Sequence, residues 1–147
     1  MKKIILVLLV VGLSACGAVG LIESSSSQVE PPVAKNIIFL IGDGMGLAHI
    51  SKATQLSDKP LNLERATVIG LSKTSSSKEV ITDSAAGATA FSIGEKTFNG
   101  AIGVDDSGKP QETILERLAK QNYATGLIAT SSITHATPAS FFSHRSS

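Results

Sequence analysis

Residues 36–46 (NIIFLIGDGMG) constrain the fold of this chain more than any other stretch. Residues 37–41 are all apolar, and a short apolar run rich in β-branched residues predicts a strand buried on both faces. Three glycines follow within five residues, and they allow the backbone to turn tightly. The stretch therefore predicts a parallel strand of an α/β sheet that ends in a tight turn.

Asp43 lies in this turn, at the carboxyl end of the predicted strand, where open α/β sheets bind their ligands. A carboxylate flanked by glycines suits a hard cation or a metal that carries a phosphate. The alternative is that Asp43 only caps the helix that follows. The stretch by itself leaves both interpretations open.

Helices and strands are expected to alternate along the rest of the chain. The apolar pattern predicts helices at 47–55 and 112–121 and strands at 67–73 and 124–130. In the second helix, Glu116 and Lys120 stand four positions apart and are expected to pair. Helix followed by strand, twice over, is typical of a largely parallel sheet.

Residues 82–90 (TDSAAGATA) consist of a polar triplet followed by small residues. Asp83 or Ser84 fits the N-cap of a helix. Alternatively, Ser84 is a nucleophile at a helix N-terminus, where backbone N–H groups favour an anion. A serine needs an activator, and a metal-bound alkoxide would supply one.

Polar residues also follow the strand predicted at 124–130. His135 and Thr137 either coordinate or orient a cation, or cap a final helix. Residues 138–144 resemble a helix that has just begun, with Pro138 in its first turn. A helix that stops so soon has little to pack against, so we expect that the chain is cut short at its C-terminus.

The first fifteen residues predict a signal peptide, with Lys2 and Lys3 before an apolar run too short to span a bilayer. Residues 13–16 (LSAC) resemble the lipobox of bacterial lipoproteins, which implies cleavage before Cys16 and lipid on that cysteine. The alternative is ordinary cleavage after Ala15, leaving a free thiol. The first interpretation predicts an exported protein, lipid-anchored at the periplasmic or cell-surface face of a bacterial membrane.

Residues 16–35 are rich in serine and proline and predict a tether between the lipidated Cys16 and a single folded domain, residues 36–147. Charges are balanced, with 13 basic and 12 acidic residues and no basic run. This composition argues against a nucleic-acid partner.

Five motifs in this order, NIIFLIGDGMG, GLSKT, TDSAAGATA, KTFNGAIGVD and THATPASFFSH, resemble the alkaline phosphatase family. The resemblance implies a three-layer α/β/α sandwich around a largely parallel sheet, with its C-terminal part missing here. It implies hydrolysis of phosphate monoesters through a phosphoserine. Two alternatives stay open: a phosphodiesterase or sulfatase-like hydrolase on the same scaffold, and a lipid-tethered anion-binding protein.

The resemblance also assigns roles to individual residues. It implies two Zn²⁺ ions and one Mg²⁺ ion, with Asp43 touching a zinc and the magnesium. Ser84 matches the nucleophile, and Asp83 matches a neighbour that helps to position a phosphate-binding arginine. Thr137 matches a magnesium ligand, and His135 a residue that acts through magnesium-bound water.

The chain departs from the family pattern at its end. The phosphate-binding arginine of the family follows the histidine that matches His144 by four positions, directly after Ser147. Arg145 is three places out of register and is expected to point elsewhere. The remaining zinc ligands and the magnesium glutamate belong to the part that follows. We therefore expect the full-length protein, a possible homodimer, to be active and this fragment to be inactive.

Overall fold

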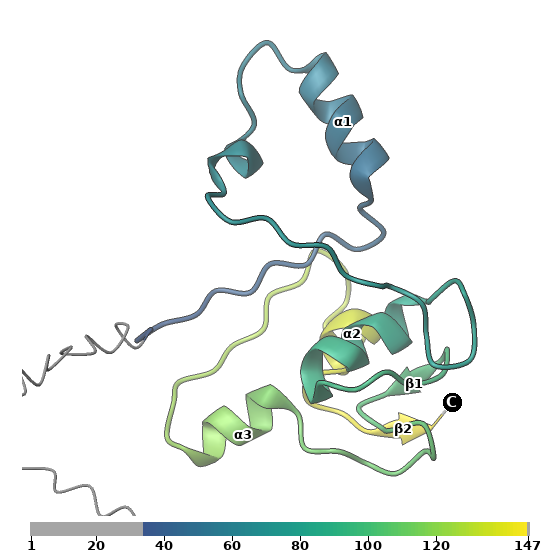
Figure 1. Ribbon diagram of the computed structural model, residues 1–147. Helices are drawn as coiled ribbons and strands as arrows, with labels where there is room; N and C mark the ends of the chain where they lie inside the picture. Colours follow the sequence, from purple (N-terminus) through teal and green to yellow (C-terminus); the bar gives the residue numbers. More distant parts are fainter. Residues whose placement is uncertain (1–33, 147) are drawn as a thin grey trace, which may run out of the picture. The chain divides into compact units, whose positions relative to one another are not determined.

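The computed structural model describes residues 34–146 (Figure 1). Every helix and strand described lies in the unit Phe39–Ser147. The elements in chain order are α1 (Leu47–Leu56), the 3₁₀ helix η1 (Asn62–Arg65), α2 (Ser84–Ile93), β1 (Ala101–Ile102), α3 (Ile114–Lys120), α4 (Ala136–Ala139) and β2 (Arg145–Ser146). The helices predicted at 47–55 and 112–121 are confirmed as α1 and α3.

Side chains at the helix N-caps explain where two of these helices begin. The Asp83 carboxylate accepts a hydrogen bond of 2.8 Å from the Ala86 N–H and so caps α2. The Thr113 hydroxyl caps α3 by accepting from the Glu116 N–H, and the Glu116 carboxylate accepts from the Thr113 N–H, which completes a capping box. Local side-chain chemistry therefore sets both starting points.

The buried core lies where α2 contacts α4 and β1 (Figure 1). Small side chains allow these elements to approach closely, and the α2 residues Ala85, Ala86 and Ala88 are all buried. Thr89 is fully buried among them. Its hydroxyl donates to the Ala101 carbonyl at 2.9 Å and accepts from the Gly103 N–H at 3.0 Å, and the Ser140 hydroxyl lies 3.1 Å away.

The individual strands predicted at 37–41, 67–73 and 124–130 are wrong for the described residues, because none of them pairs with another strand. Most of their apolar side chains are exposed, with Leu40 at 87%, Leu71 at 90% and Ile128 at 101%. A strand is stabilised by hydrogen bonds from a neighbouring backbone, and one segment's composition does not specify that neighbour.

The sheet that the described residues do form is small and antiparallel. In it, β1 pairs with β2 in a register that places Ala101 opposite Ser146. The helix expected from Pro138 instead begins at Ala136 and lasts about one turn. The chain is therefore free to turn back and add β2 alongside β1, which the sequence pattern did not predict.

The predicted pair between Glu116 and Lys120 is also wrong. Lys120 binds Glu112 at 2.8 Å, and Arg117 binds the same carboxylate at 3.2 Å. Glu116 is unavailable because its oxygens accept from the Thr113 N–H and contact the His144 ring. The capping box and a tertiary contact thus take precedence over the helical spacing.

Within residues 34–146, no helix is long and apolar enough to cross a membrane. The predicted signal peptide (residues 1–15), Cys16 and all of the tether except its last residues fall outside the described part of the chain. They stay predictions from sequence.

Candidate active site

A tight turn presents Asp43 at the start of α1. The Met45 N–H donates to the Gly42 carbonyl at 3.0 Å, which closes the turn. Gly44 has a φ of +68°, in the left-handed region that side chains other than glycine rarely adopt. The turn leaves the Asp43 carboxylate exposed beside residues without side chains.

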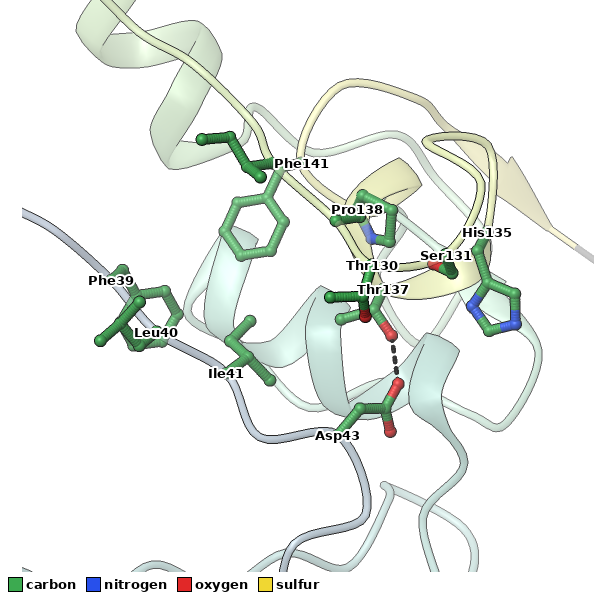
Figure 2. A pocket seen from close by; sticks show the side chains of 12 residues that line it. Phe39, Leu40, Ile41, Asp43, Thr130, Ser131, His135, Thr137, Pro138 and Phe141 are labelled. Carbon is green, nitrogen blue, oxygen red and sulfur yellow. Dashed lines mark hydrogen bonds between the residues drawn. The ribbon is translucent and has the colours of Figure 1, made fainter. Parts of the chain in front are cut away.

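Two other residues singled out in the sequence, Ser84 and Thr137, meet at Asp43. The Ser84 hydroxyl donates to one Asp43 carboxylate oxygen at 3.3 Å. The Thr137 hydroxyl donates to the other at 2.7 Å, and Figure 2 shows these two side chains pointing toward each other. Segments 41 and 94 residues from Asp43 therefore supply one hydroxyl to each oxygen of the same carboxylate.

Asp43 and Thr137 also line a cavity of about 340 Å³, together with His135 and apolar residues that include Phe39 and Phe141 (Figure 2). His135 is exposed and lies at the N-cap position of α4. Its ring makes no hydrogen bond to the part of the chain that the structure describes. The structure thus places His135 at the cavity without joining it to Asp43.

Ser84 is the first residue of α2 and is half-buried. Because the Asp83 side chain caps this helix, the Ser84 hydroxyl is left to bind Asp43. The free N–H groups at the start of a ten-residue helix favour an anion beside Ser84. The sequence left open whether Ser84 caps α2 or acts as a nucleophile. In the structure the residue that caps α2 is Asp83.

Both oxygens of Asp83 are held by backbone N–H groups. One accepts from Ala86 and the other from Gly100, each at 2.8 Å. Asp83 also lines a second hollow, of about 490 Å³, together with Arg145. No ion pair joins the two within residues 34–146. The role of Asp83 in positioning an arginine stays a prediction.

The side chains that meet at the site offer oxygen atoms as metal ligands, and oxygen ligands suit a hard cation. The described residues contain no group of three histidine, cysteine, aspartate or glutamate side chains that could hold a metal. The Asp43 carboxylate and the Thr137 hydroxyl are nevertheless the kind of ligand that Mg²⁺ prefers. These residues fit part of the coordination of such an ion.

Sequence reasoning missed Asn99, whose amide side chain binds the segment before Ser84. Its carbonyl oxygen accepts from the Asp83 N–H at 3.1 Å. The signal was present, because Asn99 lies in KTFNGAIGVD, a motif that carried the resemblance but to which no role was assigned.

This chain is similar to known alkaline phosphatases. The family model described as alkaline phosphatase matches residues 34–147. Alkaline phosphatase of Schizosaccharomyces pombe is 43% identical over an alignment of 145 residues, and this alignment covers 94% of this chain and 27% of the relative. Alkaline phosphatase 3 of Bacillus subtilis is 48% identical over an alignment of 118 residues, and this alignment covers 75% of this chain and 26% of the relative.

Solved structures agree with these relatives. Alkaline phosphatase from the Antarctic bacterium TAB5 is 53% identical and has a TM-score of 0.67, over 69% of this chain and 30% of that one. A variant of the TAB5 enzyme, solved with magnesium in its M3 site, has a TM-score of 0.68 at 52% identity, over 70% of this chain and 30% of that one. The predicted α/β fold class is confirmed.

This chain spans about a quarter of the length of the curated relatives it matches. The match covers the whole described part of the chain, residues 34–146, and includes the turn with Asp43, the start of α2 and the segment with Thr137. The chain belongs to the alkaline phosphatase family.

Proposed function

We propose that the full-length protein hydrolyses phosphate monoesters and that Ser84 is its nucleophile. The observation that carries the proposal is the contact between Ser84 and Asp43 at the N-terminus of α2. It places a hydroxyl, a carboxylate able to hold cations and a helix end that favours anions at one point. The names of the relatives favour a phosphomonoesterase over the phosphodiesterase and sulfatase alternatives.

The reaction would proceed in two displacements at phosphorus. In the first, the Ser84 hydroxyl loses its proton as its oxygen forms a bond to phosphorus, the bond from phosphorus to the alcohol oxygen breaks, and that oxygen takes up a proton as the alcohol leaves. In the second, water attacks the phosphoserine, and Ser84 and inorganic phosphate are released. Two zinc ions and a magnesium ion, when bound, would lower the pKa of the serine hydroxyl and neutralise the phosphate oxygens.

Four further residues of the site each have a role in this scheme. Asp43 would hold cations with both oxygens and orient the Ser84 hydroxyl, which already points at it. Thr137 would orient Asp43 and contribute a neutral oxygen ligand to the magnesium. His135, at the same cavity, would hold magnesium-bound water. Asp83 would hold the start of α2 in place.

Acid-quench trapping tests this proposal. The full-length protein is mixed with a ³²P-labelled phosphate monoester, quenched in acid and digested, and the labelled peptide is mapped. We expect label on Ser84 and none in the variant Ser84→Ala, with metal content nearly unchanged. The matched control is Ser92→Ala, which alters a buried serine of the same helix and should leave the label in place. Label on another residue would refute the assignment.

The 147-residue chain tested alone should give no turnover above background with a chromogenic phosphate ester, even with zinc and magnesium added. The reason is the donor set: the described residues offer Asp43 and Thr137 as ligands and no cluster of three stronger ones. Robust turnover by this chain would contradict the need for ligands from elsewhere.

We propose further that the protein is exported and anchored to a membrane by lipid on Cys16. The support is the sequence alone, a short apolar run followed by LSAC at residues 13–16. A lipid anchor would hold the phosphatase at the periplasmic or cell-surface face of a bacterial membrane.

A further inference from the structure

The amide side chain of Asn99 joins the turn after α2 to the segment that leads into Ser84. Its Oδ1 atom accepts from the Asp83 N–H at 3.1 Å. Its Nδ2 atom donates to the Ile81 carbonyl at 3.0 Å and also to the Glu79 carboxylate. Asn99 is half-buried, and both ends of its amide are used. One side chain thus contacts three residues within the five that precede Ser84.

Gly100 reinforces this contact from the same turn. Its N–H donates to the Asp83 carboxylate at 2.8 Å, and its φ of +90° lies in the region that glycine adopts without strain. Asp83 is therefore held at its backbone by Asn99 and at its side chain by Gly100. The other Asp83 oxygen caps α2, so the position of Asp83 determines where the helix begins.

Hydrophobic packing does not hold this segment in place. Val80 is 89% exposed and Ile81 is 81% exposed, although both are large apolar residues. The middle of α2, in contrast, is buried through Ala88 and Thr89. The hydrogen bonds from Asn99 and Gly100 therefore determine the path of the backbone into Ser84.

We propose that Asn99 is a positioning residue for the nucleophile, an inference that rests on the proposed function of Ser84. The Ser84 hydroxyl lies 3.3 Å from an Asp43 oxygen, longer than the usual range of about 2.5–3.0 Å for a hydrogen bond between oxygens, so a small shift of the α2 N-terminus breaks the contact. Without Asn99, the Asp83 N–H loses its partner and the segment before Ser84 loses its link to the turn. The misplaced hydroxyl then reacts more slowly, while the substrate still binds.

The first test separates reaction from binding in the full-length protein. Asn99→Ala should lower kcat and the rate of Ser84 phosphorylation, measured by rapid acid quench, by about 10- to 100-fold. KM and metal content should change by less than about threefold, because no ligand is removed. The matched control, Gln111→Ala, removes an amide that donates to Asp105 at 2.6 Å on another loop and should leave the phosphorylation rate unchanged.

A pair of further variants tests the geometry of the contact. Asn99→Asp keeps an acceptor for the Asp83 N–H but replaces the donor with a charge that faces the Glu79 carboxylate and the Ile81 carbonyl. It should be as slow as Asn99→Ala. Adding Glu79→Gln supplies a donor from the other side. The double variant should phosphorylate Ser84 at least about tenfold faster than Asn99→Asp. A double variant no faster than Asn99→Asp would count against this geometry.

Amide hydrogen exchange provides a readout that does not depend on activity. In Asn99→Ala the Asp83 amide should exchange about tenfold faster or more, whereas in Gln111→Ala it should exchange as in the wild type. Unchanged exchange in Asn99→Ala overturns the proposal, and so does faster exchange with an unchanged phosphorylation rate. If the wild-type protein is never labelled on Ser84, the proposed function fails instead, and the exchange rates still decide whether Asn99 positions the segment.

Discussion

Thr137 donates a hydrogen bond of 2.7 Å to Asp43, which stands 94 residues earlier in the chain. Ser84 donates to the other oxygen of the same carboxylate. The turn before α1, the N-terminus of α2 and the short helix α4 therefore converge on a single acidic group. A residue in this position is expected to control the metal content of the full-length protein.

Removal of the Asp43 carboxylate should lower metal content and activity together. Asp43→Ala removes both oxygens that face the two hydroxyls, so we expect metal affinity to fall by more than about tenfold, since loss of a group that merely supports a ligand already costs 10- to 100-fold. Thr137→Val should have a smaller effect, on magnesium more than on zinc, because a neutral hydroxyl is a weaker ligand. Elemental analysis of the purified proteins measures both ions, and normal metal content in Asp43→Ala would exclude Asp43 as a ligand.

The buried hydroxyl of Thr89 should contribute to stability through its contacts. Thr89→Val keeps the shape of the side chain but removes the partner of the Ala101 carbonyl and the Gly103 N–H. We expect the free energy of unfolding to fall by about 1–3 kcal/mol, which is the cost of leaving buried polar groups unsatisfied. Ser92→Ala, which removes one hydrogen bond to a carbonyl of the same helix, should cost less. Denaturant titration compares the two, and equal costs would show that the Thr89 contacts add nothing.

His144 and Glu116 should make stability depend on pH. The His144 ring contacts the Gly103 carbonyl at 2.7 Å and the Glu116 carboxylate at 3.0 Å. The Gly103 carbonyl, followed by Glu116, raises the pKa of His144 above 6.5. The Thr113 N–H, followed by His144, lowers the pKa of Glu116 below 4.5. Both ring nitrogens face acceptors, so the charged imidazolium is the form that satisfies both.

The sign of the dependence follows from these directions. The contribution of His144 is fully present below pH 6.5 and is lost as pH rises through the raised pKa. The contribution of Glu116 is present above pH 4.5 and is lost as pH falls through the lowered pKa. Thermal melts should show that the melting temperature of the wild type falls as pH rises above 6.5. This fall should be smaller in His144→Gln. An alkaline decline as steep in the variant as in the wild type would contradict the assignment to His144.

Lipid on Cys16 remains a prediction from sequence. Cells that express the protein and are fed a fatty-acid probe should label the wild type and fail to label Cys16→Ser, because the sulfur is the site of attachment. The variant should also partition out of the membrane fraction. Equal labelling of the two proteins would show that Cys16 is not lipidated.

Local sequence determined much of this protein. The glycines around Asp43 predicted the tight turn, and the apolar pattern predicted the helices that became α1 and α3. The polar triplet at 82–84 fitted the N-cap of the helix that became α2. Asp83 and Thr113 cap their helices through hydrogen bonds that span three residues. Such contacts form between neighbours in the chain, so the order of the residues is enough to predict them. The family motifs added the expectation that Asp43, Ser84 and Thr137 belong to one site.

Only the tertiary structure decided which distant groups meet. In the tertiary structure Thr137 binds Asp43, and Glu116 contacts His144 instead of Lys120. The same structure assigned Asn99 to the backbone of Asp83, and it left the apolar segment 37–41 without a paired strand. Residues far apart in sequence meet only when the loops between them close and the buried polar groups of the chain find partners. The spacing of residues within one segment does not indicate which distant residues will meet.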